Sequence, residues 1–300
     1  MKIKNFILVV LVGLGLILSG QIKAKQKMLQ VKGSDTMVNL VNVLVEEFMA
    51  RNPKVQLAIL GGGSGTGIAA LINGTCDIAN HSRPIKEKEL MMAQERGLRI
   101  HTFIIAIDGL SVIVNAHNPV EKLTLGQIGA IFRGEITNWK EVGGPDLPIT
   151  LYGRQSNSGT YVFFQEHVLG NRNYSPKMNR MNGNAQIVEA VSRDKSGIGY
   201  VGVGYVVNEK GEVFSGLKVL KVSHSLDETA YSPLSKKDVE DGLYPIVRPL
   251  FQSTIGKPTG LIRKFIEFEI RPEGQKIVSR EGFFPIGKKQ QELNAKNLEN

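Results

Sequence analysis

The feature that most restricts the fold is a pattern that occurs three times in the first hundred residues: an apolar stretch, a loop rich in glycine and hydroxyl side chains, then a helical segment. In the first unit, apolar residues recur at helical spacing from Met37 to Phe48, and the pattern stops at Asn52-Pro53. Such units predict a parallel β-sheet wrapped by helices, with the loops at the carboxyl edge of the sheet. The three loops are residues 33–36, 61–67 and 80–84.

A fourth loop of this kind, residues 154–160, has the sequence Arg-Gln-Ser-Asn-Ser-Gly-Thr. It follows the apolar residues 149–153 and precedes the helical segment 161–169, so we expect a strand, a turn and a helix. Helix starts bind anions because their first amides lack intrahelical partners and the helix dipole favours negative charge. Arg154 adds a planar fork of donors, so the sequence predicts a site for a small oxyanion here. The residues at the helix start are Ser158, Gly159 and Thr160.

The chain is expected to cross twice between two α/β domains. Residues 100–106 and 110–115 are apolar, flank Asp108-Gly109 and predict the first crossing, and residues 244–249 predict the return. The polar segment after Gly287 is expected to fray. The predicted division is a first domain of residues 26–112 and 248–288, a second domain of residues 113–247, and a polar tail of residues 289–300.

The N-terminus has the plan of a secretory signal peptide, predicted to occupy residues 1–24. A basic start precedes the apolar run 6–18, which is shorter than the roughly 20 residues that a membrane-spanning helix needs. A retained N-terminal anchor is the alternative. Gln21 stands where a bacterial lipoprotein would carry its lipidated cysteine. The sequence therefore predicts a periplasmic or secreted protein without a lipid anchor.

The charge and cysteine content argue against several kinds of protein. The formal net charge is +9, and removal of the signal peptide, which carries three lysines, leaves +6. Basic residues are scattered rather than gathered in a stripe with aromatic residues, which argues against a nucleic-acid-binding face. Cys76 is the only cysteine, so no intramolecular disulfide can form. Its apolar surroundings predict a buried side chain that acts as a small hydrophobe.

Motifs for catalysis or cofactor binding are weak. Residues 65–70 match the dinucleotide fingerprint G-x-G-x-x-A, but the next strand follows closely and no acidic residue ends it; a tight turn that merely uses glycines is the alternative. No G-x-S-x-G elbow is present, the five histidines are scattered, and no His or Cys pair has metal-ligand spacing. We therefore predict no catalytic residue, cofactor or metal. His81 and Trp139 are expected to be packing residues.

Taken in order along the chain, these segments resemble the periplasmic phosphate-binding proteins of bacterial ABC phosphate importers. The resemblance extends over essentially the whole chain after the signal peptide. Each segment alone is weakly diagnostic, but the order, with Arg-x-x-x-Ser-Gly-Thr among them, is specific. The matching segments are residues 33–36, 61–65, 82–84, 131–134, 137–139, 154–160, 197–200 and 244–250.

The resemblance implies a two-lobed α/β fold, the type II periplasmic-binding-protein fold. Two crossover strands would join the lobes, and phosphate would be held in the cleft between them. No enzyme activity is implied. Carried over by motif, the residues expected to bind phosphate are Ser34, Thr36, Met37 through its amide, Ser64, Ser82, Arg154, Ser158, Gly159 and Thr160.

Two positions depart from the best-known members of that family. Ser82 replaces an aspartate that accepts a hydrogen bond from protonated phosphate, which leaves the rejection of sulfate open. Asp35 is a candidate substitute acceptor, with an N-cap role as the alternative. Ser156 stands where an aspartate commonly orients the arginine. Arg154 is therefore expected to be oriented by another group or to pair with phosphate alone.

The function that the resemblance implies is high-affinity, non-covalent binding of inorganic phosphate and its delivery to the permease subunits of an ABC importer. The protein is expected to be a periplasmic monomer with no nucleic-acid partner. One alternative is a binder of another tetrahedral oxyanion, such as sulfate or molybdate. A secreted phosphatase that uses a serine of these loops is a second, and a phosphate sensor or surface adhesin is a third.

Overall fold

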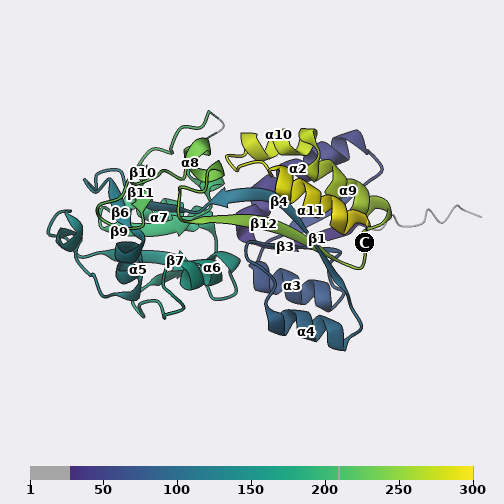
Figure 1. The fold of residues 1–300 in the computed structure, drawn as a ribbon, viewed down its shortest axis with the longest axis horizontal. Coiled ribbons are helices and arrows are strands. Elements are labelled where there is room, and N and C mark those ends of the chain that lie inside the picture. Colours follow the sequence, from purple (N-terminus) through teal and green to yellow (C-terminus); the bar gives the residue numbers. More distant parts are fainter. Residues whose placement is uncertain (1–27, 209, 300) are drawn as a thin grey trace, which may run out of the picture.

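The computed structural model describes residues 28–208 and 210–299. The predicted signal peptide lies outside these residues. Two lobes lie side by side, each built on a five-stranded β-sheet with its own helices, and two extended connections run between them (Figure 1). The first lobe holds the N-terminal strands and the C-terminal helices, while the middle of the chain forms the second lobe.

The first sheet contains the three predicted strand–loop–helix units. Strand β1 pairs in parallel with both β2 and β3, which confirms the parallel core and brings the three loops to one edge. Strand β12 runs antiparallel to both of its neighbours. In order across the sheet, the strands are β2 (Leu57–Leu60), β1 (Leu29–Gly33), β3 (Ile78–His81), β12 (Val247–Ile255) and β4 (Ile100–Gly109).

The helices of the first lobe begin and end near the predicted signals. The amphipathic helix after the first loop ends at Arg51, directly before Asn52-Pro53. Helix α3 begins after Gly63, whose φ of 90° is a conformation that residues with a side chain rarely adopt. The helices are η1 (Asp35–Met37), α2 (Val38–Arg51), α3 (Ser64–Ile72), α4 (Glu87–Glu95), α9 (Gly260–Ile270) and α10 (Pro272–Arg280).

The second sheet is also mixed. Strand β7 pairs in parallel with β8 and β9, whereas β5 runs antiparallel to β9. In order, the strands are β10 (Leu217–Val219), β5 (Ser111–Asn115), β9 (Gly197–Val201), β7 (Thr150–Arg154) and β8 (Asn179–Met181). A separate two-stranded sheet pairs β6 (Lys122–Thr124) with β11 (Lys221–Ser223).

Local signals also explain the helices of the second lobe. At α5, the Thr124 hydroxyl accepts a hydrogen bond from the Gln127 amide (3.1 Å), and the Gln127 side chain accepts one from the Thr124 amide (2.9 Å). Gly134 ends that helix in the left-handed conformation. The helices are α5 (Leu125–Arg133), η2 (Trp139–Val142), α6 (Gly159–His167), α7 (Asn184–Arg193), η3 (Val203–Tyr205) and α8 (Lys236–Glu240).

The two connections between the lobes lie side by side. Strand β4 ends at Gly109 and β5 begins at Ser111, so Leu110 alone separates the two sheets along the chain. The return passes through Ile246, whose carbonyl accepts a hydrogen bond from the Leu110 amide at 2.9 Å. The chain thus changes lobes twice within one hydrogen-bonded region in the middle of the molecule (Figure 1).

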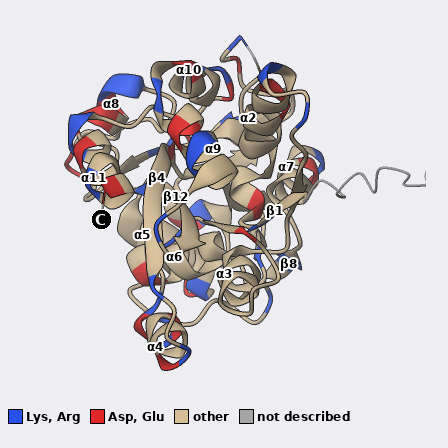
Figure 2. Ribbon diagram, turned by 90° about the vertical axis from the view of Figure 1, so that its right-hand side faces the viewer, with Lys and Arg blue, Asp and Glu red and all other residues tan. Residues whose placement is uncertain are grey.

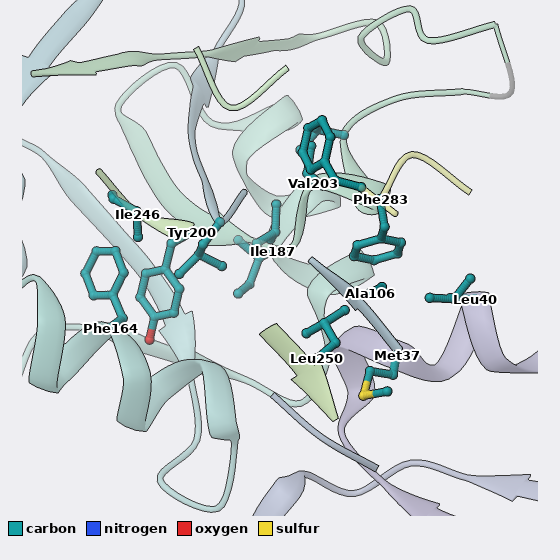
Figure 3. Packing of buried hydrophobic residues seen from close by; sticks show 14 of the residues in the cluster. Met37, Leu40, Ala106, Phe164, Ile187, Tyr200, Val203, Ile246, Leu250 and Phe283 are labelled. Carbon is teal, nitrogen blue, oxygen red and sulfur yellow. The ribbon is translucent and has the colours of Figure 1, made fainter. Parts of the chain in front are cut away.

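Buried apolar side chains form one large cluster that extends through both lobes and the connections. Figure 3 shows Met37 and Leu40 of the first lobe, Phe164 and Tyr200 of the second, and Leu250 of β12. The Phe164 and Tyr200 rings stack with their centroids 4.0 Å apart. This packing supports the loops that end between the lobes.

The polar tail does not fray, contrary to our expectation. Residues Lys288–Glu299 form helix α11, and Asn294 is fully buried. Its side chain accepts a hydrogen bond from the Ile104 amide (2.8 Å) and donates one to the Ile104 carbonyl (2.7 Å). Because β4 is an edge strand, Asn294 satisfies backbone groups that would otherwise lack a partner strand. Polar composition alone does not reveal such a contact.

In the view of Figure 2, the basic and acidic residues lie on many helices and loops rather than along one stripe of the ribbon. This distribution agrees with the scattered pattern of lysines and arginines in the sequence. Within residues 28–208 and 210–299, no helix combines the length and the hydropathy needed to cross a membrane.

Candidate anion-binding site

The three serines predicted from the first lobe lie together. The Ser34 hydroxyl, after β1, donates a hydrogen bond to the Ser82 hydroxyl, after β3, at 3.0 Å. The Ser82 hydroxyl lies 3.3 Å from that of Ser64, at the start of α3, and the Ser82 amide donates to the Ser64 hydroxyl at 3.1 Å. All three side chains are buried. The parallel sheet therefore assembles one hydroxyl cluster from three separate loops.

The first residues of α6 in the second lobe contact this cluster directly. A Cβ atom on Gly159 would overlap the Ser64 hydroxyl and would lie 2.7 Å from the Ser82 hydroxyl, so only glycine fits. The hydroxyls of Thr36 and Thr160 are 2.8 Å apart, one from each lobe. The predicted strand, turn and helix around residues 154–160 are present, and the helix start faces the loops of the other lobe.

Two further predicted ligands, Ser158 and Met37, also make hydrogen bonds within the protein. The Ser158 hydroxyl is the N-cap of α6 and accepts from the amides of Thr160 (3.2 Å) and Tyr161 (3.4 Å). The Met37 amide, predicted to bind the anion, donates to the Ser34 carbonyl at 3.1 Å. The Met37 side chain points into the core (Figure 3). Both residues lie next to the site, and both shape its backbone.

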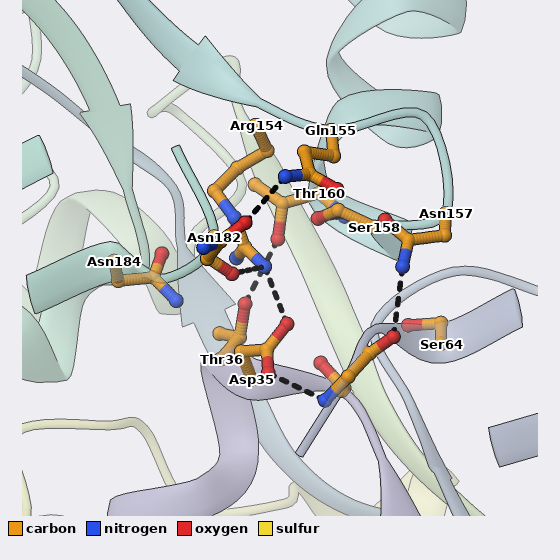
Figure 4. Close-up of polar contacts among 12 residues, drawn as sticks. Asp35, Thr36, Ser64, Arg154, Gln155, Asn157, Ser158, Thr160, Asn182 and Asn184 are labelled. Atoms are coloured by element: carbon orange, nitrogen blue, oxygen red, sulfur yellow. Dashed lines mark hydrogen bonds and ion pairs between the residues drawn. The ribbon is translucent and has the colours of Figure 1, made fainter. Parts of the chain in front are cut away.

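Arg154 ends β7 and is almost fully buried, with its side chain 2% exposed. Its Nη2 forms an ion pair with the Asp35 carboxylate and donates to the Asn182 carbonyl at 2.8 Å (Figure 4). Among the described residues, Nε and Nη1 of Arg154 have no hydrogen-bond partner, and neither has Nδ2 of Asn184. Buried donors without partners are rare and costly, which marks this region as a place for an acceptor-rich ligand.

Asp35 orients Arg154 from the opposite lobe. Its second carboxylate oxygen accepts a hydrogen bond from the Gly62 amide at 2.8 Å. The N-cap alternative for Asp35 was wrong, because Ser34 occupies the N-cap position and Asp35 lies inside η1. Ser156, which stands where an aspartate commonly orients the arginine, is exposed. The carboxylate that pairs with Arg154 comes instead from Asp35, which is distant in sequence.

Arg248 and Asp108 form a second arginine–aspartate pair, which was not among the predicted site residues. Both side chains are inaccessible to solvent, at 1% and 0%. Nε and Nη2 of Arg248 donate to one Asp108 oxygen at 2.9 and 2.8 Å. Burial lowers the pKa of the Arg248 guanidinium, while Asp108 acts to raise it. Each residue is a single charge within an apolar strand, and this was the signal in the sequence that could have revealed the pair.

The residues expected to have packing roles do have them. Trp139 is fully buried and donates from its ring to the Ser196 carbonyl at 2.9 Å. His81 is fully buried between the Arg83 carbonyl and the Ser253 hydroxyl, and burial lowers its pKa to about 4. Cys76 is buried, and burial raises the pKa of its thiol to about 11.

The glycine motif of residues 65–70 has a packing role. Residues 65–70 lie within α3, where a Cβ atom on Gly67 would overlap the Lys32 carbonyl. This glycine allows close packing of helix on strand. Within the described ranges, no group of three His, Cys, Asp or Glu side chains could hold a metal ion.

Comparisons with known proteins agree with this architecture. A family model for the PBP superfamily domain matches residues 20–273. Protein SphX of Synechococcus elongatus is 33% identical over 273 residues, which cover 88% of this chain and 79% of that protein. The phosphate-binding protein PstS of Pseudomonas aeruginosa is 30% identical over 283 residues, which cover 89% and 85%.

Solved structures show the same fold. A protein from Clostridium perfringens, solved with bound phosphate, has a TM-score of 0.76 and 30% identity over 87% of this chain and 100% of that chain. An ABC-type phosphate transport receptor from Vibrio cholerae has a TM-score of 0.68 and 28% identity, over 86% and 100%. The predicted two-lobed type II fold is confirmed. The chain belongs to the PBP superfamily and, within it, to the family of the bacterial phosphate-binding proteins.

Proposed function

We propose that this protein binds inorganic phosphate non-covalently between its two lobes. The observation that carries the proposal is the set of buried, unpartnered donors on Arg154 and Asn184, beside hydroxyls contributed by both lobes. A tetrahedral oxyanion offers several acceptors in a small volume and can satisfy these donors together. The names of the similar proteins from Pseudomonas aeruginosa and Vibrio cholerae specify phosphate as the ligand.

Closure of the lobes around a ligand would be stabilised by hydrogen bonds between the two lobes. Gly65 donates from its amide to the Asn157 carbonyl at 3.0 Å, and the Asn157 side chain donates to the Gly62 carbonyl at 2.9 Å. Both hydrogen bonds join the two lobes beside the hydroxyl cluster. We take the lobes to divide at Leu110 and Ile246, where the chain passes between the two sheets, rather than at the predicted bounds of 26–112 with 248–288 and 113–247, and we assign the tail helix α11 to the first lobe. A ligand that bridges them shifts the population toward the closed form.

Selectivity against sulfate would depend on the serine cluster. Both carboxylate oxygens of Asp35 are engaged, by Arg154 and by the Gly62 amide, which disfavours Asp35 as an acceptor for a phosphate proton. Hydroxyls such as that of Ser82 can accept or donate. We expect Ser82→Asp to sharpen the rejection of sulfate, since a carboxylate accepts from protonated phosphate and repels a fully ionised anion. Identical sulfate competition in both proteins would remove Ser82 from the selectivity filter.

Calorimetric titration with phosphate, repeated in excess sulfate, tests the proposal. The protein is first freed of bound phosphate by unfolding, dialysis and refolding. We expect tight one-to-one binding that survives sulfate. Binding that sulfate abolishes would favour a general receptor for tetrahedral oxyanions, and an absence of phosphate binding would overturn the proposal.

We further propose that the protein acts in the periplasm as a monomer, delivers phosphate to an ABC permease and has no enzymatic activity. Of the described histidines, none hydrogen-bonds to Ser34, Ser64, Ser82 or Ser158, and the Ser158 hydroxyl caps α6. Turnover of a chromogenic phosphate ester that disappears in Ser158→Ala would support the phosphatase alternative. Phosphate binding without restored uptake in a strain that lacks its receptor would support a sensor or adhesin.

A further inference from the structure

An Asn-Gly pair, Asn182-Gly183, lies in the turn between β8 and α7, directly beside the candidate site. The Asn182 carbonyl accepts a hydrogen bond from Nη2 of Arg154 at 2.8 Å (Figure 4). The side-chain oxygen of Asn182 accepts a hydrogen bond from the Gln155 side chain. Asn182 is nevertheless exposed. Solvent therefore reaches a residue whose backbone and side chain both contact the loop 154–160.

Asparagine is chemically labile in proteins, and it is most labile before glycine. The backbone nitrogen of the following residue attacks the side-chain carbonyl carbon of asparagine. A C–N bond forms, the attacking nitrogen loses its proton to solvent, and the side-chain nitrogen leaves as ammonia, which gives a cyclic succinimide. Water then opens the ring, so the net reaction consumes water and releases ammonia. Glycine favours the attack because it has no side chain to hinder it and an adaptable backbone.

The local structure leaves the Gly183 amide available for this attack. Gly183 is the N-cap residue of α7, and within the described ranges its amide makes no hydrogen bond. Apart from its chain neighbours, no heavy atom lies within 4 Å of the position that a Cβ on Gly183 would take. The attacking nitrogen is thus free of a competing partner, and water can reach the ring that forms.

The sequence contains a second Asn-Gly pair, Asn73-Gly74, at the end of α3. This pair is also exposed, and the space beside Gly74 is also open. However, the Gly74 amide donates to the Leu71 carbonyl at 3.1 Å. The Asn73 side-chain oxygen accepts from Arg96 at 2.6 Å. Attack at Asn73 must first break the amide hydrogen bond, so this pair is a matched internal comparison.

Both products of ring opening place a negative charge beside Arg154. When water opens the ring at the former side-chain carbonyl, aspartate forms, with its carboxylate near Gln155. When water opens it at the backbone carbonyl, isoaspartate forms, and the carbonyl that accepts from Arg154 becomes the free carboxylate. Either carboxylate competes with an anionic ligand for the donors of Arg154 and repels that ligand.

We propose that Asn182-Gly183 is a deamidation site, and that its conversion to aspartate or isoaspartate lowers the affinity of the neighbouring site for phosphate. The reaction needs only water and no enzyme or cofactor. The loss of affinity rests on the proposed phosphate-binding function, whereas the modification itself does not. Deamidation at this pair sets a chemical limit to the time for which the protein binds its ligand.

The first test follows the modification in the full chain. Protein freed of phosphate is kept in mildly alkaline buffer, which promotes loss of the amide proton, and is then digested and analysed by mass spectrometry. We expect conversion at Asn182 to be at least about fivefold faster than at Asn73, where a hydrogen bond must first break. Equal rates at the two asparagines, or no conversion at Asn182, would overturn the assignment.

A control variant tests the attacking atom. Gly183 has a φ of −141° and a ψ of 167°, extended values that any residue adopts, so Gly183→Ala fits the fold and its methyl group hinders the attack. We expect this variant to bind phosphate as wild type does and to resist conversion at Asn182. Conversion as fast as in wild type would overturn attack by the Gly183 amide.

The second test measures the consequence for binding. The converted protein is separated from the unconverted protein by ion exchange, and phosphate affinity is measured by calorimetry. We expect the converted fraction, and fresh Asn182→Asp, to bind phosphate at least about tenfold more weakly than fresh wild type. Asn73→Asp adds the same charge at the exposed end of α3 and should bind as wild type does.

A converted fraction that binds phosphate as tightly as fresh wild type would overturn the effect on affinity. So would an equal loss in Asn73→Asp, because the loss would then follow from net charge rather than from the position beside Arg154. If fresh wild type fails to bind phosphate, the proposed function fails instead, and mass spectrometry still decides whether Asn182 is the site of deamidation.

Discussion

The two arginine–aspartate pairs between the lobes have the same chemistry and opposite hydrogen-bond states. Arg154 pairs with Asp35, whose side chain is 18% exposed. Two nitrogens of Arg154 have no hydrogen-bond partner among the described residues. Arg248 pairs with Asp108 in full burial, and each of its nitrogens donates to a protein acceptor. One pair is incomplete without a ligand, whereas the other is complete.

From this difference we expect Arg154 to bind the anion and Arg248 to organise the site. A buried donor gains free energy from a ligand only if the protein has left it unsatisfied. The four side chains together carry no net charge. An anion at this site would therefore be held by directed hydrogen bonds and backbone dipoles rather than by excess positive charge.

The largest effect on stability is expected from Arg248→Met, because it leaves the Asp108 carboxylate buried without a cation. We expect the free energy of unfolding to fall by about 3–5 kcal/mol, measured by urea denaturation without phosphate. The double variant Arg248→Met with Asp108→Leu should recover most of this loss, because it removes both charges. Arg263→Met, at a partly exposed pair, should change stability by less than about 1 kcal/mol. A similarly small change in Arg248→Met would contradict the distinction between the pairs.

Arg154→Ala should show the reverse pattern, a large effect on binding and a small one on folding. Phosphate affinity, measured by calorimetry, is expected to fall at least about tenfold because unsatisfied donors are removed. Asp35 is partly exposed and can be hydrated, so the free energy of unfolding should fall by only about 1 kcal/mol. Unchanged affinity would rule out Arg154 as a ligand.

Glu269 sharpens the comparison because it is a buried acid with an amide, not a cation, as its partner. Gln252 donates to one Glu269 oxygen at 3.0 Å, while the other Glu269 oxygen and the Gln252 amide oxygen have no partner within residues 28–208 and 210–299. Protonation of Glu269 would turn an unpartnered acceptor into a hydrogen-bond donor. Burial raises the pKa of Glu269 well above its usual range, which favours the protonated acid in the folded protein.

The raised pKa of Glu269 makes the wild-type protein lose stability as pH rises. Its contribution is fully present below the unfolded pKa of about 4.5 and is lost as pH increases through the folded pKa. Glu269→Gln keeps a paired amide and removes this slope. We expect it to be more stable than wild type by at least about 1 kcal/mol at high pH and nearly equal at about pH 5. The free energy of unfolding of both proteins is measured by urea denaturation across this pH range. If it changes with pH in the same way in both, Glu269 does not titrate as described.

Much of the fold could be predicted because its signals are local. Apolar periodicity from Met37 to Phe48 and the Asn52-Pro53 stop mark α2, and the loop 154–160 marks a strand, a turn and a helix. The tail helix α11 could not be predicted in this way. Its contact with the first lobe depends on Asn294 meeting the backbone of Ile104, an encounter between residues far apart in the chain.

By itself, the sequence determined the residue types of the site and the edge of the sheet where the first three loops would meet. Only the tertiary structure decided how the groups are used. In the tertiary structure, Asp35 of one lobe orients Arg154 of the other, and the Ser158 hydroxyl caps a helix. Arg248 lies within hydrogen-bond distance of the Thr36 and Thr160 hydroxyls. The physical reason is that backbone propensities act over a few residues, whereas hydrogen-bond partners of buried polar groups are chosen by three-dimensional proximity.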